Sequence, residues 1–176
     1  MKSNIALIGF MGVGKTAVGK ALAKRLGKKF VELDSLIEQR AGKSIPEIFQ
    51  QDGEVAFREL EIEVTSKVAT GKNQVIACGG GLVLNKINID RLREGAVIVY
   101  LTASPQIVLK RTSADRNGRP LLNVSDRAAE IKRLLAFRKP FYERAADISI
   151  NTSRLSIDAI VEQIVSGLKQ DESFNL

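Results

Sequence analysis

Apolar residues in this chain of 176 residues gather in short, near-continuous runs, and the longer stretches between them repeat apolar positions at helical spacing. The runs cover residues 5–8, 30–33, 75–78, 96–101 and 148–150. Such runs are typical of parallel strands that are covered on both faces. The pattern therefore predicts a three-layer α/β/α domain, in which right-handed crossovers place helices on both faces of a five-stranded parallel sheet.

Capping residues indicate where several of the helices begin and end. Residues 44–47, Ser-Ile-Pro-Glu, form a capping box with proline in the first turn, and Ser104-Pro105 is a similar helix start. The glycines placed to end helices are Gly27, Gly71 and Gly95.

The last predicted helix has the clearest apolar stripe. Its apolar residues recur at helical spacing from Ile157 to Leu168, and Ser156 is placed as the N-cap. We expect residues 1–168 to form a single domain, since a chain of this length suits one core. The polar segment 169–176 is expected to fray.

Residues 9–16, Gly-Phe-Met-Gly-Val-Gly-Lys-Thr, match the phosphate-binding loop pattern G-x-x-x-x-G-K-[ST] between a predicted strand and a predicted helix. The glycines let main-chain N–H groups approach phosphate oxygens, while Lys15 supplies a cation and Thr16 a hydroxyl for Mg²⁺. We therefore expect this loop to bind a nucleoside triphosphate. The predicted contacts are Gly12, Val13, Gly14, Lys15, Thr16 and Ala17.

The composition restricts the chemistry that the chain can perform. It has no histidine and a single cysteine, Cys78, which ends an apolar run and is expected to be an inert buried residue. An intrachain disulfide, a cysteine-rich zinc site and a histidine base are therefore excluded. Catalysis must rely on carboxylates, lysine, arginine and Mg²⁺.

The formal net charge of +7 indicates anionic partners, and most of the excess lies in residues 110–144. Nucleic acid is not expected, because tryptophan is absent and no aromatic residues alternate with the basic ones. No apolar stretch approaches the ~18 residues that a membrane helix needs, and the N-terminus leads directly into the first strand. We expect a soluble, cytoplasmic protein without a membrane partner.

The positions of the acidic residues argue against a molecular switch or motor. Such phosphate-loop proteins place an acidic residue at the end of a later strand, where it organises Mg²⁺ and water. Here a glycine triplet and Thr-Ala-Ser follow the two later central runs, and the acidic pair, Glu32 and Asp34, follows the second run. A guanine-reading N-K-x-D element is also missing, since residues 85–88 read Asn-Lys-Ile-Asn. A GTPase is therefore disfavoured.

Further motifs occur in an order and spacing that resemble those of the shikimate kinases, from residue 5 to about 168. The motifs are residues 9–16, Glu32-Leu33-Asp34, Asp52-Gly53-Glu54, Phe57-Arg58, Gly79-Gly80-Gly81, Arg119-Pro120-Leu121-Leu122, and Arg138 with Pro140 and Tyr142. The resemblance implies a P-loop kinase fold, similar to nucleoside monophosphate kinases, with a mobile lid at about residues 113–125. It also implies transfer of the ATP γ-phosphoryl group to the 3-hydroxyl of shikimate, within chorismate and aromatic amino-acid biosynthesis.

The resemblance also implies which residues hold the acceptor. Arg58 and Arg138 are expected to bind the carboxylate of shikimate, and Asp34 to bind ring hydroxyls and take the proton of the attacking one. The residues expected to let the main chain approach the ring are Gly79, Gly80 and Gly81.

The residues alone leave other interpretations of two of these positions open. Arg58 flanks an apolar stripe and is able to pair with Glu61 along the same helix. Asp34 is able to cap a helix that begins at Ser35.

The nucleotide side of the site follows from the resemblance in the same way. Arg119, in the lid, is expected to join Lys15 in stabilising charge on the transferred phosphoryl group, and Arg111 and Arg154 are expected to border adenine. Thr16 is expected to bind Mg²⁺ directly and Glu32 through a water molecule. Glu32 departs from the aspartate usual in the family, and its longer side chain can shift the metal geometry.

Two other functions remain as alternatives. Another small-molecule kinase, such as a gluconate kinase, would share the nucleotide side of the site and differ in the acceptor pocket. A regulatory module would bind ATP without transferring its phosphate. For the shikimate kinase we expect ATP and shikimate as partners and a monomer in solution.

Overall fold

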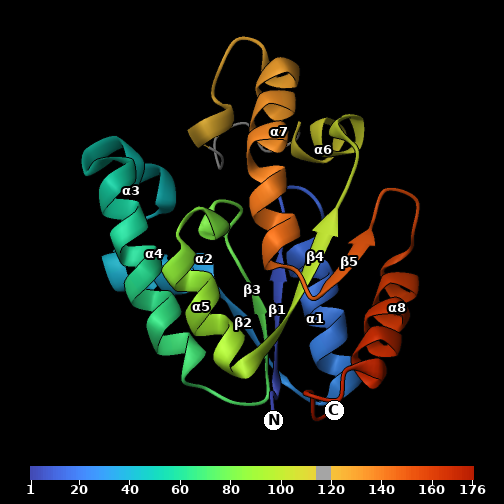
Figure 1. Ribbon diagram of the computed structural model, residues 1–176. Helices are drawn as coiled ribbons and strands as arrows, with labels where there is room; N and C mark the ends of the chain where they lie inside the picture. Colours follow the sequence, from blue (N-terminus) through green and yellow to red (C-terminus); the bar gives the residue numbers. More distant parts are fainter. Residues whose placement is uncertain (114–119) are drawn as a thin grey trace.

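The structure, a computed structural model, describes residues 1–113 and 120–176 (Figure 1). A five-stranded parallel sheet lies at its centre, with the strands in the order β2-β3-β1-β4-β5. The strands are β1 (Asn4–Ile8), β2 (Lys29–Glu32), β3 (Gln74–Ala77), β4 (Ala96–Thr102) and β5 (Ile148–Asn151). The predicted sheet is confirmed, although Leu33 begins a helix instead of ending the second strand.

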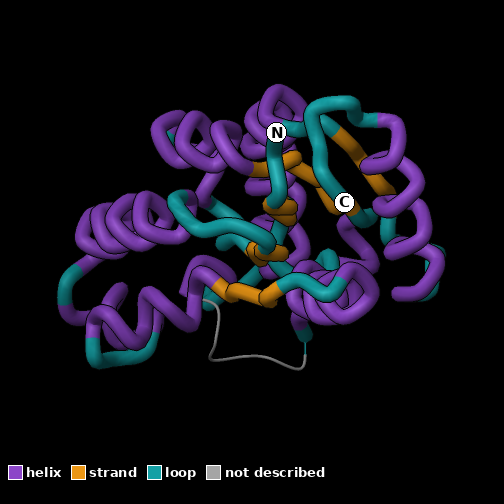
Figure 2. Tube along the Cα trace, turned by 90° about the horizontal axis from the view of Figure 1, so that it is seen from below, coloured by secondary structure: helices purple, strands orange, loops and turns teal. Residues whose placement is uncertain are grey.

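Helices cover both faces of this sheet, as predicted, and Figure 2 shows them on either side of the strands. The helices are α1 (Lys15–Leu26), α2 (Leu33–Ala41), α3 (Ile45–Gln51), α4 (Gly53–Ala69), α5 (Lys86–Gly95), α6 (Pro105–Thr112), α7 (Arg127–Ala145) and α8 (Ile157–Gln170), with short 3₁₀ helices η1 (Leu82–Leu84) and η2 (Pro120–Leu122). In the part of the chain that the structure describes, no helix is both long enough and apolar enough to cross a membrane.

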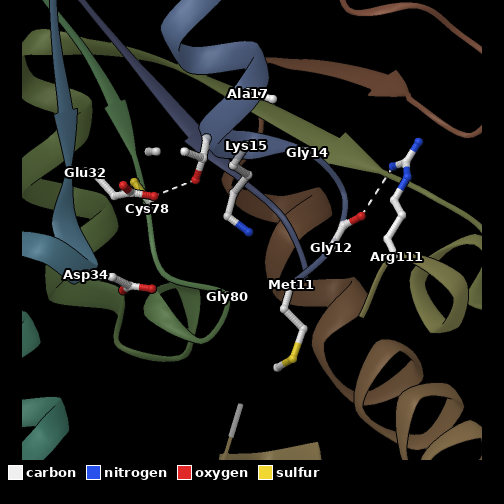
Figure 3. A pocket seen from close by; sticks show the side chains of 12 residues that line it. Met11, Gly12, Gly14, Lys15, Ala17, Glu32, Asp34, Cys78, Gly80 and Arg111 are labelled. Carbon is white, nitrogen blue, oxygen red and sulfur yellow. Dashed lines mark hydrogen bonds between the residues drawn. The ribbon is translucent and has the colours of Figure 1, made fainter. Parts of the chain in front are cut away.

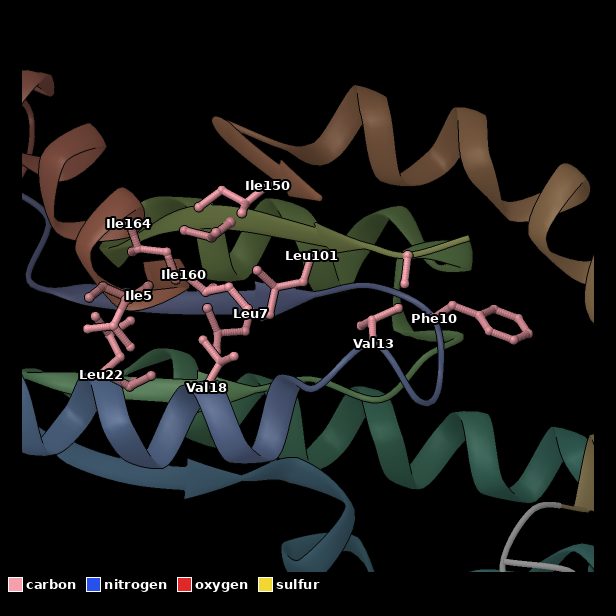
Figure 4. Close-up of a cluster of buried hydrophobic side chains, with 14 of the residues drawn as sticks. Ile5, Leu7, Phe10, Val13, Val18, Leu22, Leu101, Ile150, Ile160 and Ile164 are labelled. Atoms are coloured by element: carbon pink, nitrogen blue, oxygen red, sulfur yellow. The ribbon is translucent and has the colours of Figure 1, made fainter. Parts of the chain in front are cut away.

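The side chains of the central strand β1 divide between two cores. Ile5 and Leu7 pack with α1 and α8 on one face, a cluster shown in Figure 4. Ala6 and Ile8 pack with α2, α4 and α5 on the opposite face. All four side chains are fully buried, which is why this strand has a continuous apolar sequence without polar alternation.

The predicted helix caps are present in the structure. Gly27 ends α1 in the left-handed region at φ 64°, where a residue without Cβ is favoured. Ser44 and Glu47 form the capping box at the start of α3, with Ser44 N donating to Glu47 Oε2 over 2.8 Å. Ser104 and Ser156 each accept a hydrogen bond from a main-chain N–H in the first turn of α6 and α8.

The C-terminal segment 169–176 differs from the expected frayed tail. Helix α8 continues to Gln170, and the chain then pairs with the N-terminus, because Lys2 N donates to Ser173 O over 2.7 Å and Asn175 N donates to Lys2 O over 2.8 Å. Phe174 is buried against the core on the α1 and α8 side of the sheet. A single aromatic anchor in a polar segment gives no periodic signal, so the pattern of the sequence did not reveal it.

Candidate functional site

The phosphate-binding loop joins the carboxyl end of the central strand β1 to α1, at the end of the sheet where the parallel strands finish (Figure 3). Gly9, Gly12 and Gly14 have φ angles of 145°, 77° and 104°, in the region that favours glycine. A Cβ at Gly12 would also lie 2.8 Å from Thr112 Cγ2 on α6. Lys15 Nζ donates to the carbonyl oxygens of Gly9 and Phe10 over 2.8 Å each, so the lysine folds back across the mouth of its own loop.

A cavity of about 480 Å³ opens in front of this loop. It is lined by Met11, Gly12, Gly14, Lys15, Thr16, Ala17, Glu32, Asp34, Ala77, Cys78, Gly80 and Arg111. The cavity thus brings most of the predicted nucleotide contacts together with Glu32, at the end of β2, and Asp34, just after it. Val13 differs, since its side chain is buried in the core and only its main chain faces this region.

Thr16 and Glu32 meet at one side of the cavity. Thr16 Oγ1 donates a hydrogen bond of 2.5 Å to Glu32 Oε1. A hydroxyl and a carboxylate are the oxygen ligands that Mg²⁺ prefers, and a Mg²⁺ ion beside phosphates takes few ligands from the protein. Within the described residues, no group of three or more His, Cys, Asp or Glu side chains could hold a metal ion. A Mg²⁺ ion here would therefore need phosphate oxygens among its ligands. The residues present therefore fit a Mg²⁺ ion that arrives with the nucleotide.

Arg111 spans the outer side of the phosphate-binding loop. Its Nη1 donates to the carbonyl oxygens of Gly12 and Val13 over 3.3 Å, and its Nη2 donates to Thr152 O over 3.2 Å. Thr152 is buried, and its hydroxyl donates to Val13 O over 2.9 Å. Thr152 is not among the predicted nucleotide contacts. In the structure, Thr152 is the residue that ties β5 to the loop.

Arg154 and Arg119 are the remaining predicted nucleotide contacts. Arg154 lines a separate hollow of about 790 Å³ near the start of α6 and the end of β5. Arg119 lies outside the described residues, so its predicted role stays a prediction.

A second, smaller cavity of about 120 Å³ adjoins the first. Its lining includes every predicted acceptor residue: Asp34, Arg58, Gly79, Gly80, Gly81 and Arg138. Met11, Asp34 and Gly80 line both cavities. Ligands bound in the two cavities would therefore face each other across these three residues.

Arg58, on α4, makes the pairing that the sequence left open and also lines the second cavity. Its Nη1 donates to Glu61 Oε2 over 3.0 Å and its Nη2 donates to Glu54 Oε1 over 3.1 Å. The guanidinium carbon lies 5.0 Å from the centre of the Phe57 ring. These contacts hold the planar cation in one orientation, which suits bidentate binding of a carboxylate.

Asp34 does not cap a helix, so that alternative interpretation is wrong. Helix α2 begins at Leu33 with Glu32 as its N-cap, which leaves Asp34 in the first turn. A Cβ at Gly79 would lie 3.0 Å from Asp34 Oδ1. The carboxylate therefore lies directly against the glycine run, at the boundary of the two cavities (Figure 3).

Glu61 is a site residue to which the sequence assigned no functional role. Its side chain is 1% exposed, and burial raises its pKa above the ordinary value of 4.5 despite the partly compensating charge of Arg58. A Cβ at Gly79 would lie 3.0 Å from Glu61 Oε1. The sequence signal for Glu61 was its place on the apolar stripe that carries Phe57 and Val64, because a carboxylate is rarely buried without a partner.

Arg138, on α7, is the second cation of the smaller cavity. Its residue exposure is only 2%, and its guanidinium carbon lies 5.6 Å from the centre of the Phe10 ring. Burial of a cation needs an anionic or polar partner. A site lined by two arginines and a carboxylate can hold a small hydroxy acid next to a bound polyphosphate.

Comparisons with known proteins agree with this geometry. The family model described as shikimate kinase matches residues 11–169. A shikimate kinase of Symbiobacterium thermophilum is 43% identical over 168 residues, covering 95% of this chain and 97% of the relative. A shikimate kinase of Caldanaerobacter subterraneus subsp. tengcongensis is 46% identical over 162 residues, covering 92% of this chain and 94% of the relative.

Solved structures give the same result. The shikimate kinase from Acinetobacter baumannii in complex with shikimate is similar with a TM-score of 0.93 and 35% identity, covering 98% of this chain and 96% of that one. A gluconokinase from Sinorhizobium meliloti 1021 is similar with a TM-score of 0.58 and 18% identity, over 96% of this chain and 92% of that one. The second likeness concerns the fold alone.

Proposed function

This chain belongs to the shikimate kinase family, and on that premise we propose that it transfers the γ-phosphoryl group of ATP to the 3-hydroxyl of shikimate. The products are shikimate 3-phosphate and ADP, in the biosynthesis of chorismate and the aromatic amino acids. The observation that carries the proposal is the boundary between the two cavities, where Asp34 lies against both. A donor phosphate and an acceptor hydroxyl can meet only there.

The larger cavity takes the nucleotide. Main-chain N–H groups of residues 12–17 and the Lys15 ammonium bind the phosphates, with the start of α1 adding its positive end. Arg111 and the adjoining Thr152 border the base. Thr16 would hold Mg²⁺ directly and Glu32 would hold it through a water molecule. When bound, Mg²⁺ neutralises phosphate charge during transfer.

The smaller cavity takes shikimate. Arg58 and Arg138 bind its carboxylate through charge-assisted hydrogen bonds. Asp34 accepts hydrogen bonds from the ring hydroxyls at the opposite end. The glycine run lets the main chain come close to the ring, because no Cβ fills that space.

In the transfer step, a bond forms between the 3-oxygen of shikimate and the γ-phosphorus, and the bond from this phosphorus to the β,γ-bridging oxygen breaks. Asp34 orients the hydroxyl and receives its proton, and ADP leaves with the bridging oxygen. Lys15 stabilises the charge on the phosphoryl oxygens, and so does Arg119 if the lid prediction holds. Closing residues 113–125 over the site would exclude water and suppress hydrolysis of ATP.

Identification of the product tests this function. The purified protein, ATP, Mg²⁺ and shikimate should yield a phosphate monoester on the 3-oxygen, detected by ³¹P NMR and mass spectrometry. Inorganic phosphate alone, or phosphate on another hydroxyl, would contradict the proposal. The monomeric state and the cytoplasmic location stay predictions, and a gluconate kinase is disfavoured because that likeness extends to the fold only.

A further inference from the structure

Gly80 lies at the junction between the phosphate-binding loop and the acceptor arginines. It lines both cavities. A Cβ at this position would lie 3.4 Å from Met11 N and 3.5 Å from Arg138 Nη1. A shift of this one peptide would therefore change how the glycine run lies against Arg138 in the acceptor cavity.

Tyr142 on α7 fixes the carbonyl group of that peptide. Its side chain is fully buried, and its hydroxyl donates a short hydrogen bond to Gly80 O. Burial raises the pKa of the phenol above its ordinary value, so the hydroxyl stays protonated and donates. The ring stacks on Tyr100 of β4, with centroids 4.9 Å apart and planes inclined by 15°. The stacked ring leaves the hydroxyl little freedom to move.

The same helix face carries one of the acceptor arginines. Arg138 and Tyr142 are one turn apart on α7, so they lie on the same side of the helix. The Arg138 charge partly offsets the rise in the pKa of Tyr142, since the two groups are close. Tyr142 thus ties the glycine run to the helix that presents Arg138.

The rest of the turn after β3 is held in a similar way. Asn88 on α5 is fully buried and its Nδ2 donates to Leu82 O over 3.3 Å. Leu82 N and Leu84 N donate to Gly79 O and Gly81 O over 3.2 and 3.1 Å. Tyr142 is the side chain that fixes the part of this turn facing both ligands.

We propose that Tyr142 is a positioning residue for the acceptor: its hydroxyl holds the Gly80 peptide in register with Arg138, so that the glycine run and the guanidinium face the same shikimate molecule. The inference rests on the proposed function and deepens it. It predicts a selective effect on the acceptor, because the nucleotide phosphates are held by the loop and Lys15, whereas the Tyr142 hydroxyl bonds to the glycine run of the acceptor cavity.

The test is Tyr142→Phe, which removes one oxygen atom and keeps the ring stack. The KM for shikimate should rise roughly three- to tenfold, as expected for the loss of one positioning hydrogen bond, while the KM for ATP stays within twofold of wild type. Calorimetric titration of shikimate should show the same loss of affinity. Tyr100→Phe, from the same stacked pair, is the matched control and should leave both KM values unchanged.

A purely structural role would give a different result. Tyr142→Phe would then lower the melting temperature without changing the KM for shikimate, or would change both KM values equally, and either result would overturn the inference. Gly80→Ala is a second variant in case Tyr142→Phe does not fold, because the Gly80 backbone lies outside the left-handed region. Its methyl group would lie in ordinary contact with Arg138 Nη1, at 3.5 Å, and would fill space beside the guanidinium in the acceptor cavity. The KM for shikimate should therefore rise more than the KM for ATP, and no selective rise would count against the inference. Failure of the wild-type protein to phosphorylate shikimate would instead refute the proposed function.

Discussion

Thr16 and Glu32 are joined by a hydrogen bond of 2.5 Å from the threonine hydroxyl to the carboxylate, which connects the phosphate-binding loop to the end of β2. The contact depends on the length of the glutamate side chain, since an aspartate at position 32 would be one methylene shorter. The residue that departs from the family pattern therefore reaches the predicted Mg²⁺ ligand directly. We therefore expect Glu32 to influence the Mg²⁺ dependence of the proposed reaction.

Glu32→Gln should raise the Mg²⁺ concentration needed for half-maximal activity by about 10- to 100-fold, the usual cost of losing an outer partner of a metal ligand. The measurement is a Mg²⁺ titration of the initial rate at saturating ATP and shikimate. Glu63→Gln is the control, because Glu63 pairs with Arg40 and Lys67 away from the cavity. An unchanged Mg²⁺ requirement in Glu32→Gln would remove Glu32 from the metal site.

Arg58→Lys should weaken shikimate binding about tenfold, because an ammonium group keeps the charge but cannot bind a carboxylate through two parallel hydrogen bonds. ATP affinity should be unchanged. Isothermal titration calorimetry with each ligand measures both quantities. The matched control is Arg40→Lys, since Arg40 pairs with Glu63 at the surface. Equal losses for both ligands would contradict the assignment of Arg58 to the acceptor.

Arg119→Ala should lower kcat by about a thousandfold with little change in the KM for shikimate, because the charge of a phosphoryl-binding arginine matters mainly in the transition state. Arg116→Ala, in the same segment, is the comparison. The kcat values of the two variants, measured by steady-state kinetics, show which arginine acts on the phosphoryl group. If Arg116→Ala shows the large loss and Arg119→Ala does not, the resemblance has been carried over to the wrong arginine.

Glu61 should make stability depend on pH. The Glu61 carboxyl group holds its proton more tightly in the folded protein than in the unfolded chain, because burial raises the pKa of this group above 4.5. Its stabilising contribution is full below pH 4.5 and is lost as the pH rises through the raised pKa of the folded state. The melting temperature of the wild type, relative to that of Glu61→Gln, should therefore fall as the pH rises from about 4.5 into the neutral range. A difference that grows with pH would show that Arg58 controls the ionisation of Glu61.

The sequence was most informative where the structure is local. Near-continuous apolar runs predicted the sheet, because a strand that is covered on both faces has no face turned to solvent. The capping box at Ser44 and the loop at 9–16 are defined by neighbouring residues, so both could be recognised without a fold. Phe174 escaped notice because its anchoring contact is made with distant core residues.

The acceptor site was far less predictable from the residues alone. Arg58 and Arg138 lie on α4 and α7, far apart in the sequence, and line one cavity only in the folded chain. Nothing in their sequence neighbours separates them from ordinary surface arginines. Tyr142 acts through a tertiary contact with Gly80. Glu61 pairs with Arg58 within one helix, but its burial depends on the fold. Resemblance to a family supplied the arginines, and only the structure revealed what supports them.

In the proposed reaction, two adjoining cavities present shikimate to the γ-phosphate of ATP. A coupled assay of ADP release, with shikimate and gluconate offered separately in the presence of Mg²⁺ and ATP, tests this arrangement. ADP should be released rapidly with shikimate and only at the background rate with gluconate. Turnover with gluconate alone, or no ADP release above background with either acid, would contradict it.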